Sequence, residues 1–208
     1  MSAVQFNTLE QEHEAAHFGM WVFLATEVML FGGLFNAYTF YRTLYPLGFA
    51  EGSRHMDVTL GTTNTIVLLV SSATMALAVD AARRLHLQAA RRFLLITALL
   101  GLVFLGLKLV EYRAHAIEGL VPGLLWTYDG PYPNQVQLFM LAYFTMTGLH
   151  AVHLTIAVGV VAYLLLTVRG EDALPARHTR VEISGLYWHF VDILWVFLWP
   201  LLYLYGVR

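Results

Sequence analysis

Two ionisable residues stand inside a long apolar stretch near the C-terminus of the chain. His189 and Asp192 fall within residues 183–206, which are otherwise almost wholly apolar. At about 100° per residue, a helix places Asp192 on the same side as Trp188 and Trp195, so that one carboxylate lies in an aromatic stripe. The stretch is long enough to cross a bilayer, which takes roughly 20 residues. Ionisable groups at that depth are functional candidates, although an interhelical pair that braces a bundle would use the same residues.

A second carboxylate is expected inside the first apolar stretch. Glu27 is the only charged residue of residues 18–41 and is aligned at helical spacing with Met20 and Phe31. At this depth a carboxyl group is expected to be protonated or paired. Glu27 could therefore relay protons, or it could take part in a structural hydrogen bond.

Three histidines raise the question of a metal or haem site. His150 and His153 are about 60° apart around one predicted helix, and His189 lies on another. Two of the three are crowded onto one helix and no H-E-x-x-H spacing occurs, which disfavours a haem or metal site. The alternative is that neutral imidazoles form hydrogen bonds across the bundle. The sequence also has no glycine-rich phosphate loop or serine nucleophile elbow, so the chain is not expected to catalyse a reaction alone.

The composition identifies an integral membrane protein. Of 208 residues, 58% are hydrophobic and 12% are charged, whereas about a quarter of a soluble domain is charged. The absence of cysteine excludes disulfides and thiolate metal sites, and the net charge of −2 argues against nucleic acid as a partner. The first 16 residues are polar and acidic, so we expect no cleavable signal peptide.

The apolar stretches predict an all-α bundle of five transmembrane helices in a single domain. The helices are expected at about residues 18–41, 59–79, 93–112, 136–168 and 183–206. We expect a loop at residues 42–57, because Pro46, Gly48 and Gly52 are helix breakers. Lys108 and Glu111 are spaced for an i,i+3 ion pair or for snorkelling to the membrane surface.

The arginines predict the orientation of the bundle. The loops after the second and fourth helices hold seven of them, at positions 83, 84, 91, 92, 169, 177 and 180, whereas the opposite side holds four, at positions 42, 54, 113 and 208. By the positive-inside rule, the N-terminus is cytoplasmic.

Four stretches together resemble subunit III of the haem-copper oxidases, the terminal oxidases of respiratory chains. They are residues 19–33, residues 64–65 with 71–72, residues 147–153, and Glu182 followed by residues 187–192. Their order and spacing are similar to the five-helix form of the family from about residue 17 onwards. The seven-helix form has two further N-terminal helices, which help to form a lipid-filled cleft. Lys108 departs from the family pattern, which has Gln there, and a cation near the outer face could alter a partner contact.

The resemblance implies a non-catalytic subunit of a cytochrome c or quinol oxidase in the bacterial plasma membrane. Such a subunit holds no haem or metal itself and packs on subunit I, whose haem and copper centres reduce oxygen to water while protons are pumped. The family's subunit III binds phospholipids, protects subunit I from inactivation and supports its proton uptake. Further oxidase subunits and a respiratory supercomplex are the other implied partners.

The resemblance also implies roles for single residues. Glu27 matches the family's buried, carbodiimide-reactive carboxylate. Intramembrane polar positions with a bracing role are matched by His150, His153, Glu182, His189 and Asp192. By charge alone, Arg169, Arg177 and Arg180 could hold anionic lipid headgroups, or could simply set the topology.

Two other functions stay open from the sequence. One is an accessory subunit of nitric oxide reductase, which five-helix chains of this type can be. The other is a self-contained proton or solute transporter built around Glu27 and Asp192, which the lack of internal repeats and broken helices disfavours. If Asp192 has a buried partner, Asp192→Leu is expected to weaken assembly, because that partner is left unpaired.

Overall fold

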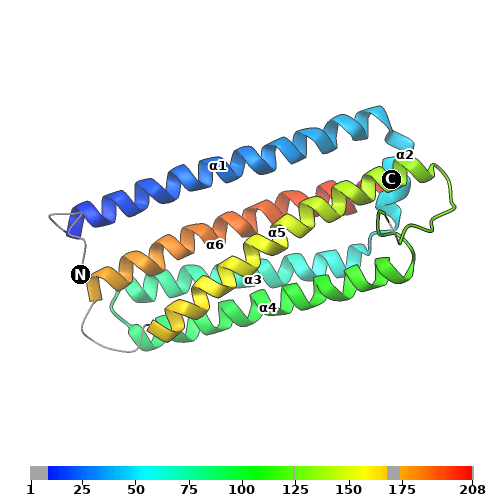
Figure 1. Cartoon of the computed structure of the whole chain (residues 1–208). Helices are drawn as coiled ribbons and strands as arrows, with labels where there is room; N and C mark the ends of the chain where they lie inside the picture. Colours follow the sequence, from blue (N-terminus) through cyan, green and yellow to red (C-terminus); the bar gives the residue numbers. More distant parts are fainter. Residues whose placement is uncertain (1–8, 124, 168–173, 208) are drawn as a thin grey trace.

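The computed structural model describes residues 9–123, 125–167 and 174–207, and the long elements of this part of the chain are α-helices (Figure 1). They are α1 (Leu9–Leu44), α2 (Pro46–Arg54), α3 (Val58–Arg83), α4 (Leu87–Ile117), α5 (Pro133–Thr167) and α6 (Leu174–Tyr203), followed by the 3-10 turn η1 (Tyr205–Val207). Five of the helices, all except the short α2, are long and apolar enough to cross a membrane. The predicted all-α bundle with five spans is therefore confirmed.

Most long helices extend beyond the predicted apolar stretches. The helix α1 has 36 residues and is therefore about 54 Å long, compared with a hydrocarbon core of about 30 Å. The apolar pattern stops where polar residues begin, whereas the backbone hydrogen bonds continue into the headgroup region and beyond. At the N-terminal end the extension is nine residues for both α1 and α6, which begin at Leu9 and Leu174.

The core of the bundle is formed by α3, α4, α5 and α6, while α1 lies along one side (Figure 1). Among the helices of the described residues, α1 packs against α2, α5 and α6. In the most apolar 18-residue segment of α1, only 11% of the residues are buried, compared with 50% in the corresponding segment of α6. Large apolar side chains such as Met29 therefore remain exposed on α1. In a membrane this face must meet lipid or another protein.

Two glycines allow the core helices to approach closely. A Cβ atom added to Gly61 on α3 would lie 2.8 Å from the Tyr203 ring of α6, and one added to Gly101 on α4 would lie 2.9 Å from the Trp188 ring. These distances are too short for real Cβ contacts. Small residues at these two positions therefore make room for the large aromatic side chains of α6.

The prediction of a loop at residues 42–57 is wrong for most of that range, because the helix α2 occupies Pro46–Arg54. Pro46 lies at the start of the helix, where its missing N–H and fixed φ are compatible with a helix. Gly48 and Gly52 do not break α2. They are buried, and Gly52 packs against the Phe139 ring of α5.

Side chains from α1 and α2 satisfy the backbone at the end of α6. The Tyr38 hydroxyl donates to the Leu201 carbonyl at 2.9 Å, and the Ser53 hydroxyl donates to the Leu202 carbonyl at 2.7 Å. The carbonyls of the last helical turn have no partner within a helix, and a buried helix end requires such donors. These bonds fix the C-terminal end of the bundle.

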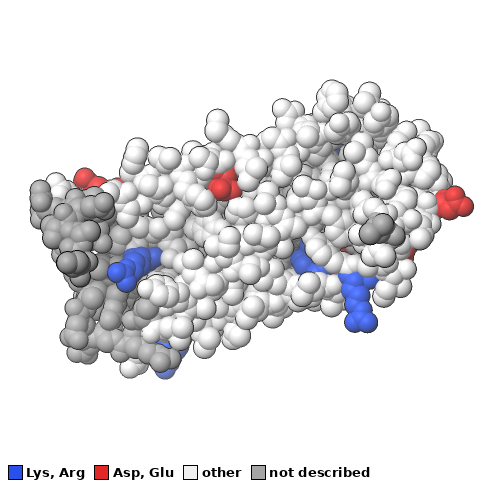
Figure 2. Space-filling model, in the orientation of Figure 1, with Lys and Arg blue, Asp and Glu red and all other residues white. Residues whose placement is uncertain are grey.

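The surface agrees with a membrane-embedded bundle. On the face in Figure 2, most of the surface is uncharged, and most of the charged side chains lie towards the two ends. This distribution is typical of a protein whose middle section lies in hydrocarbon.

Candidate functional site: polar groups inside the bundle

Glu27 and His153 connect α1 to α5. The Glu27 carboxyl Oε2 lies 2.8 Å from His153 Nε2, and His153 Nδ1 lies 2.8 Å from the Leu149 carbonyl oxygen. Both side chains are largely buried, with 14% and 10% of their surface exposed. The Phe31 ring packs edge-on against the imidazole. The pair is thus a direct polar link between the peripheral helix and the core.

The geometry around His153 fixes where one proton lies. A carbonyl oxygen only accepts, so Nδ1 carries a hydrogen and donates it to Leu149. One further proton is then shared between Nε2 and the Glu27 carboxyl, which form either a neutral pair or an ion pair. In both states the pair has no net charge, which makes it tolerable within a membrane.

His150 faces a different part of the bundle from His153. Its ring is fully buried, lies edge-on to Phe104 at 5.6 Å and is tilted against Trp195 at 5.1 Å between ring centroids. Among the described residues, neither ring nitrogen has a hydrogen-bond partner. The structure thus separates the two histidines of α5, and it does not bring them to a common ligand.

Lys108 and Glu111 on α4 form the centre of a fully buried polar network. The Lys108 ammonium donates to the Glu111 carboxylate at 2.9 Å, to the Tyr143 hydroxyl at 3.0 Å and to the Tyr203 hydroxyl at 2.9 Å. Both hydroxyls in turn donate to Glu111 Oε1, at 2.8 and 2.5 Å. Every ammonium proton and both hydroxyl protons are therefore used, which is the condition under which a buried ion pair is tolerated.

The sequence predicted only part of this network. The i,i+3 pair is confirmed, with 2% of Lys108 and 3% of Glu111 exposed. Snorkelling does not occur, because the ammonium group is held inside the bundle. The interpretation of Lys108 as an outer-face cation that alters a partner contact is wrong for the same reason. Tyr143 and Tyr203 gave no signal in the sequence, since a tyrosine on an apolar helix face looks like any other aromatic core residue.

The aromatic stripe of α6 is bound to α3 through hydroxyl groups. The Trp188 indole N–H donates to Ser71 and the Trp195 indole N–H donates to Thr65, both at 3.1 Å. His189 Nδ1 lies 2.8 Å from the Ser72 hydroxyl. These contacts give Thr65, Ser71 and Ser72 of α3 a role, because a buried indole N–H or imidazole nitrogen needs a hydrogen-bond partner.

Asp192 is buried without a charged partner. Only 3% of it is exposed. Ser72 lies beside it, but neither carboxyl oxygen has a well-formed hydrogen bond to a described residue. The described residues therefore offer Asp192 a polar neighbour, Ser72, and no charged partner.

Two of the remaining candidates, Glu182 and Arg180, lie at the N-terminal end of the bundle. Glu182 forms an ion pair with Arg83 and lies 3.9 Å from His17, so that it joins α6 to α3 and α1. Arg180 is exposed on α6. Arg169 and the side chain of Arg177 lie outside the described residues. Within those residues, no group of three or more histidine, aspartate or glutamate side chains is placed to hold a metal ion.

The sequence profile of one family, described as cytochrome c oxidase subunit III, matches residues 5–207. Cytochrome c oxidase subunit 3 of Alkalihalophilus pseudofirmus is 30% identical to the chain, across 91% of this chain and 86% of that protein. Quinol oxidase subunit 3 of Bacillus spizizenii is also 30% identical, across 91% of this chain and 86% of that protein.

A third similar protein joins two subunits in one polypeptide. The haem-copper oxidase subunit I+III of Aeropyrum pernix is 34% identical to the chain over 196 residues, which are 89% of this chain and 22% of that protein. The match thus covers almost the whole of this chain and a minor part of the longer polypeptide.

Proposed function

The chain belongs to the cytochrome c oxidase subunit III family, and on that basis we propose that it is the non-catalytic subunit III of a proton-pumping haem-copper terminal oxidase. In this role it packs against subunit I, stabilises it during turnover and supports its proton uptake. The observation that carries the proposal is the match over residues 5–207, which includes all five spans.

The fused relative supports subunit I as the partner. In the Aeropyrum pernix protein, one polypeptide is named for both subunits. Two chains that function when fused are expected to lie side by side when separate. The exposed apolar side chains of α1 are suited to such a contact within the membrane, because α1 buries so little of its surface in its own bundle.

The interior of the bundle supports a bracing role. Lys108, Glu111, Tyr143 and Tyr203 satisfy one another, and the indoles of α6 bind hydroxyls of α3. Groups that are already satisfied in this way hold helices together and leave no open position for a substrate. We assign the same bracing role to His153, Glu182 and His189, and assign His150 and Asp192 to the packed core. Glu27 is the residue that we assign to proton supply, through the proton that it shares with His153.

The arginine distribution supports a cytoplasmic N-terminus. Arg180 and Arg83 lie at the end of the bundle that holds the start of α1, as the salt bridges of Glu182 require. On that side we assign headgroup contacts to Arg169, Arg177 and Arg180, each worth about 1 kcal/mol beside an anionic surface.

Copurification tests the proposal. The chain is tagged in its own host, extracted in mild detergent and analysed by its optical spectrum and subunit content. We expect a larger haem-bearing subunit in constant ratio, and no haem absorbance once the chain is separated from it. Haem or copper bound to the pure chain, or proton flux in vesicles that contain this chain alone, would contradict the proposal and support a self-contained protein.

A further inference from the structure

His189 brings a polar ring to the surface of the bundle in the middle of the membrane. Its side chain is half-buried, and its Nδ1 atom lies 2.8 Å from the Ser72 hydroxyl of α3. In the apolar span Thr179–Tyr203, His189 is 10 residues from the nearer end, which is about 15 Å along the axis. This distance is half the thickness of a hydrocarbon core of about 30 Å, so His189 lies near the midplane.

The second ring nitrogen of His189, Nε2, is open to the surroundings of the bundle. Within the described residues, the hydrogen bond of the ring is the one between Nδ1 and Ser72, and no charged group acts on the imidazole. Both ring nitrogens of His150 are enclosed by the bundle, whereas Nε2 of His189 is not. The structure describes all five spans along their full length. No side chain of a neighbouring span therefore binds Nε2.

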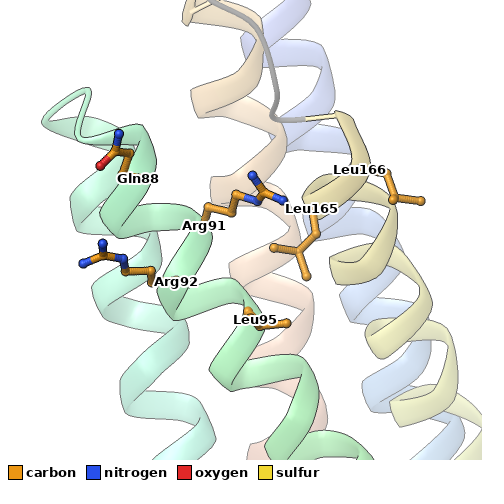
Figure 3. A pocket seen from close by; sticks show the side chains of 6 residues that line it. All are labelled: Gln88, Arg91, Arg92, Leu95, Leu165 and Leu166. Atoms are coloured by element: carbon orange, nitrogen blue, oxygen red, sulfur yellow. The ribbon is translucent and has the colours of Figure 1, made fainter.

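Polar side chains at the ends of the helices need no such partner. Figure 3 shows Gln88, Arg91 and Arg92 close to the start of α4, at a level where water and lipid headgroups solvate them. Acyl chains at the level of His189 offer neither a donor nor an acceptor, and an unsatisfied polar group in hydrocarbon is costly. The Nε2 atom therefore requires a polar group from outside this chain.

The surface around Nε2 is suited to another transmembrane helix. Helices α3, α4, α5 and α6 form the core and α1 packs on α5 and α6, so that the outer face of α6 lies between α1 and α3. Beside His189, α6 exposes Ile193 one turn further on, and α3 exposes Leu69 and Ala76 on either side of Ser72. A small residue such as Ala76 lets a second helix approach closely enough for a hydrogen bond.

From this arrangement we propose that the outer face of α6 and α3 docks a transmembrane helix of the haem-bearing subunit, whose hydroxyl or carboxamide side chain binds His189 Nε2. The Ser72 hydroxyl can donate to Nδ1 or accept from it, so Nε2 correspondingly donates or accepts. Hydroxyl and carboxamide groups can do both and add no charge at the midplane. The inference rests on the proposed oxidase function, and it extends the contact with subunit I from α1 across α6 to α3.

Photo-crosslinking in the assembled complex tests where the partner helix lies. The photoreactive residue p-benzoylphenylalanine replaces Ile193 or, as the matched control, Leu102. The two side chains are similarly exposed, at 54% and 52%, but Leu102 lies on α4, which does not pack on α6. We expect the probe at Ile193 to link to the haem-bearing subunit and the probe at Leu102 not to do so. Links from Leu102 alone, or from Ile193 to a second copy of this chain, would overturn the docking surface.

Substitution of His189 tests the hydrogen bond. His189→Phe keeps a ring of similar size and removes both nitrogens. The dissociation constant of the chain from the complex, measured by dilution in mild detergent with native mass spectrometry, should rise about three- to eighteenfold, the equivalent of 0.6–1.7 kcal/mol for an interhelical hydrogen bond. His189→Gln, which keeps a polar group, should raise it less. Thr145→Val is the control, because this exposed hydroxyl already binds the Leu141 carbonyl at 2.7 Å, and should change nothing.

Ser72→Ala separates docking from bracing inside the chain. It removes the bond to Nδ1 and leaves Nε2 in place, so the dissociation constant should rise less than in His189→Phe. Equal rises in the two variants would mean that bracing alone explains the loss, and an unchanged constant in His189→Phe would mean that Nε2 has no partner in the complex. Either result would overturn this contact while the haem-bearing subunit still copurifies. Failure of the proposed oxidase function would instead appear as the absence of that subunit.

Discussion

Lys108 and Glu111 lie one helical turn apart on α4, and their charged groups meet at 2.9 Å in a region where almost no part of either side chain is exposed. Two tyrosine hydroxyls, from α5 and α6, each accept from the ammonium group and donate to the carboxylate. The pair therefore depends on three helices being in place. Removing one member should affect the bundle far more than an ordinary i,i+3 pair on a helix surface, which is worth only a few tenths of a kcal/mol.

Lys108→Met should strongly destabilise the chain. It leaves the Glu111 carboxylate buried without its cation, a situation that costs about 3–5 kcal/mol in proteins. The free energy of unfolding in mixed detergent micelles measures the effect. The double variant Lys108→Met with Glu111→Leu should recover most of the loss, because no unpaired charge remains. A double variant as unstable as the single one would show that the ion pair itself stabilises the bundle.

Tyr203→Phe should cost about 1–3 kcal/mol in the same unfolding assay. The change removes one acceptor of the Lys108 ammonium and one donor to Glu111, and both groups are then incompletely satisfied. Tyr132→Phe is the matched control, because Tyr132 is exposed in the connection before α5. If both variants unfold alike, the hydroxyl of Tyr203 has no part in holding α6 to α4.

The sequence predicts which segments form membrane helices, but it does not predict which side chains of different helices meet. Five spans could be predicted, because an apolar run of 20 residues specifies a membrane helix locally. The partner of Glu27 could not, since His153 is 126 positions away and the contact depends on how α1 and α5 are rotated and aligned. The Lys108–Glu111 pair could be proposed from its spacing, but its two tyrosines come from distant helices. The helix α2 was missed because Pro46 stops a helix in its interior and favours one at its start.

Glu27→Gln should leave the chain and its complex assembled. With hydrogen on His153 Nδ1, the Nε2 atom can accept from a glutamine amide, so the link between α1 and α5 is kept. Glu27→Leu removes the link, and a double-mutant cycle with His153→Leu should give a coupling of about 0.6–1.7 kcal/mol, as for interhelical hydrogen bonds in membranes. Subunit ratios after purification and unfolding in micelles supply the two measurements. Loss of the complex in Glu27→Gln would mean that the ionised carboxylate is structurally necessary.

For Asp192→Leu, the structure changes the expected effect on stability from a loss to no change or a gain. The sequence favoured weaker assembly, on the premise of a buried partner, but neither carboxyl oxygen is well bonded to a described residue. Burying a polar group without such a bond costs about 1–3 kcal/mol, so the leucine variant should be as stable as the parent chain or more stable by up to that amount. The subunit ratio of the complex should not change, because only 3% of Asp192 is exposed and a partner subunit has little access to it.

Asp192→Asn keeps the shape and polarity of the side chain and serves as the control. Weaker assembly or easier unfolding of the leucine variant alone would mean that the carboxyl is held in place, by Ser72 or by buried water, and that its burial stabilises the packing of α6 on α3.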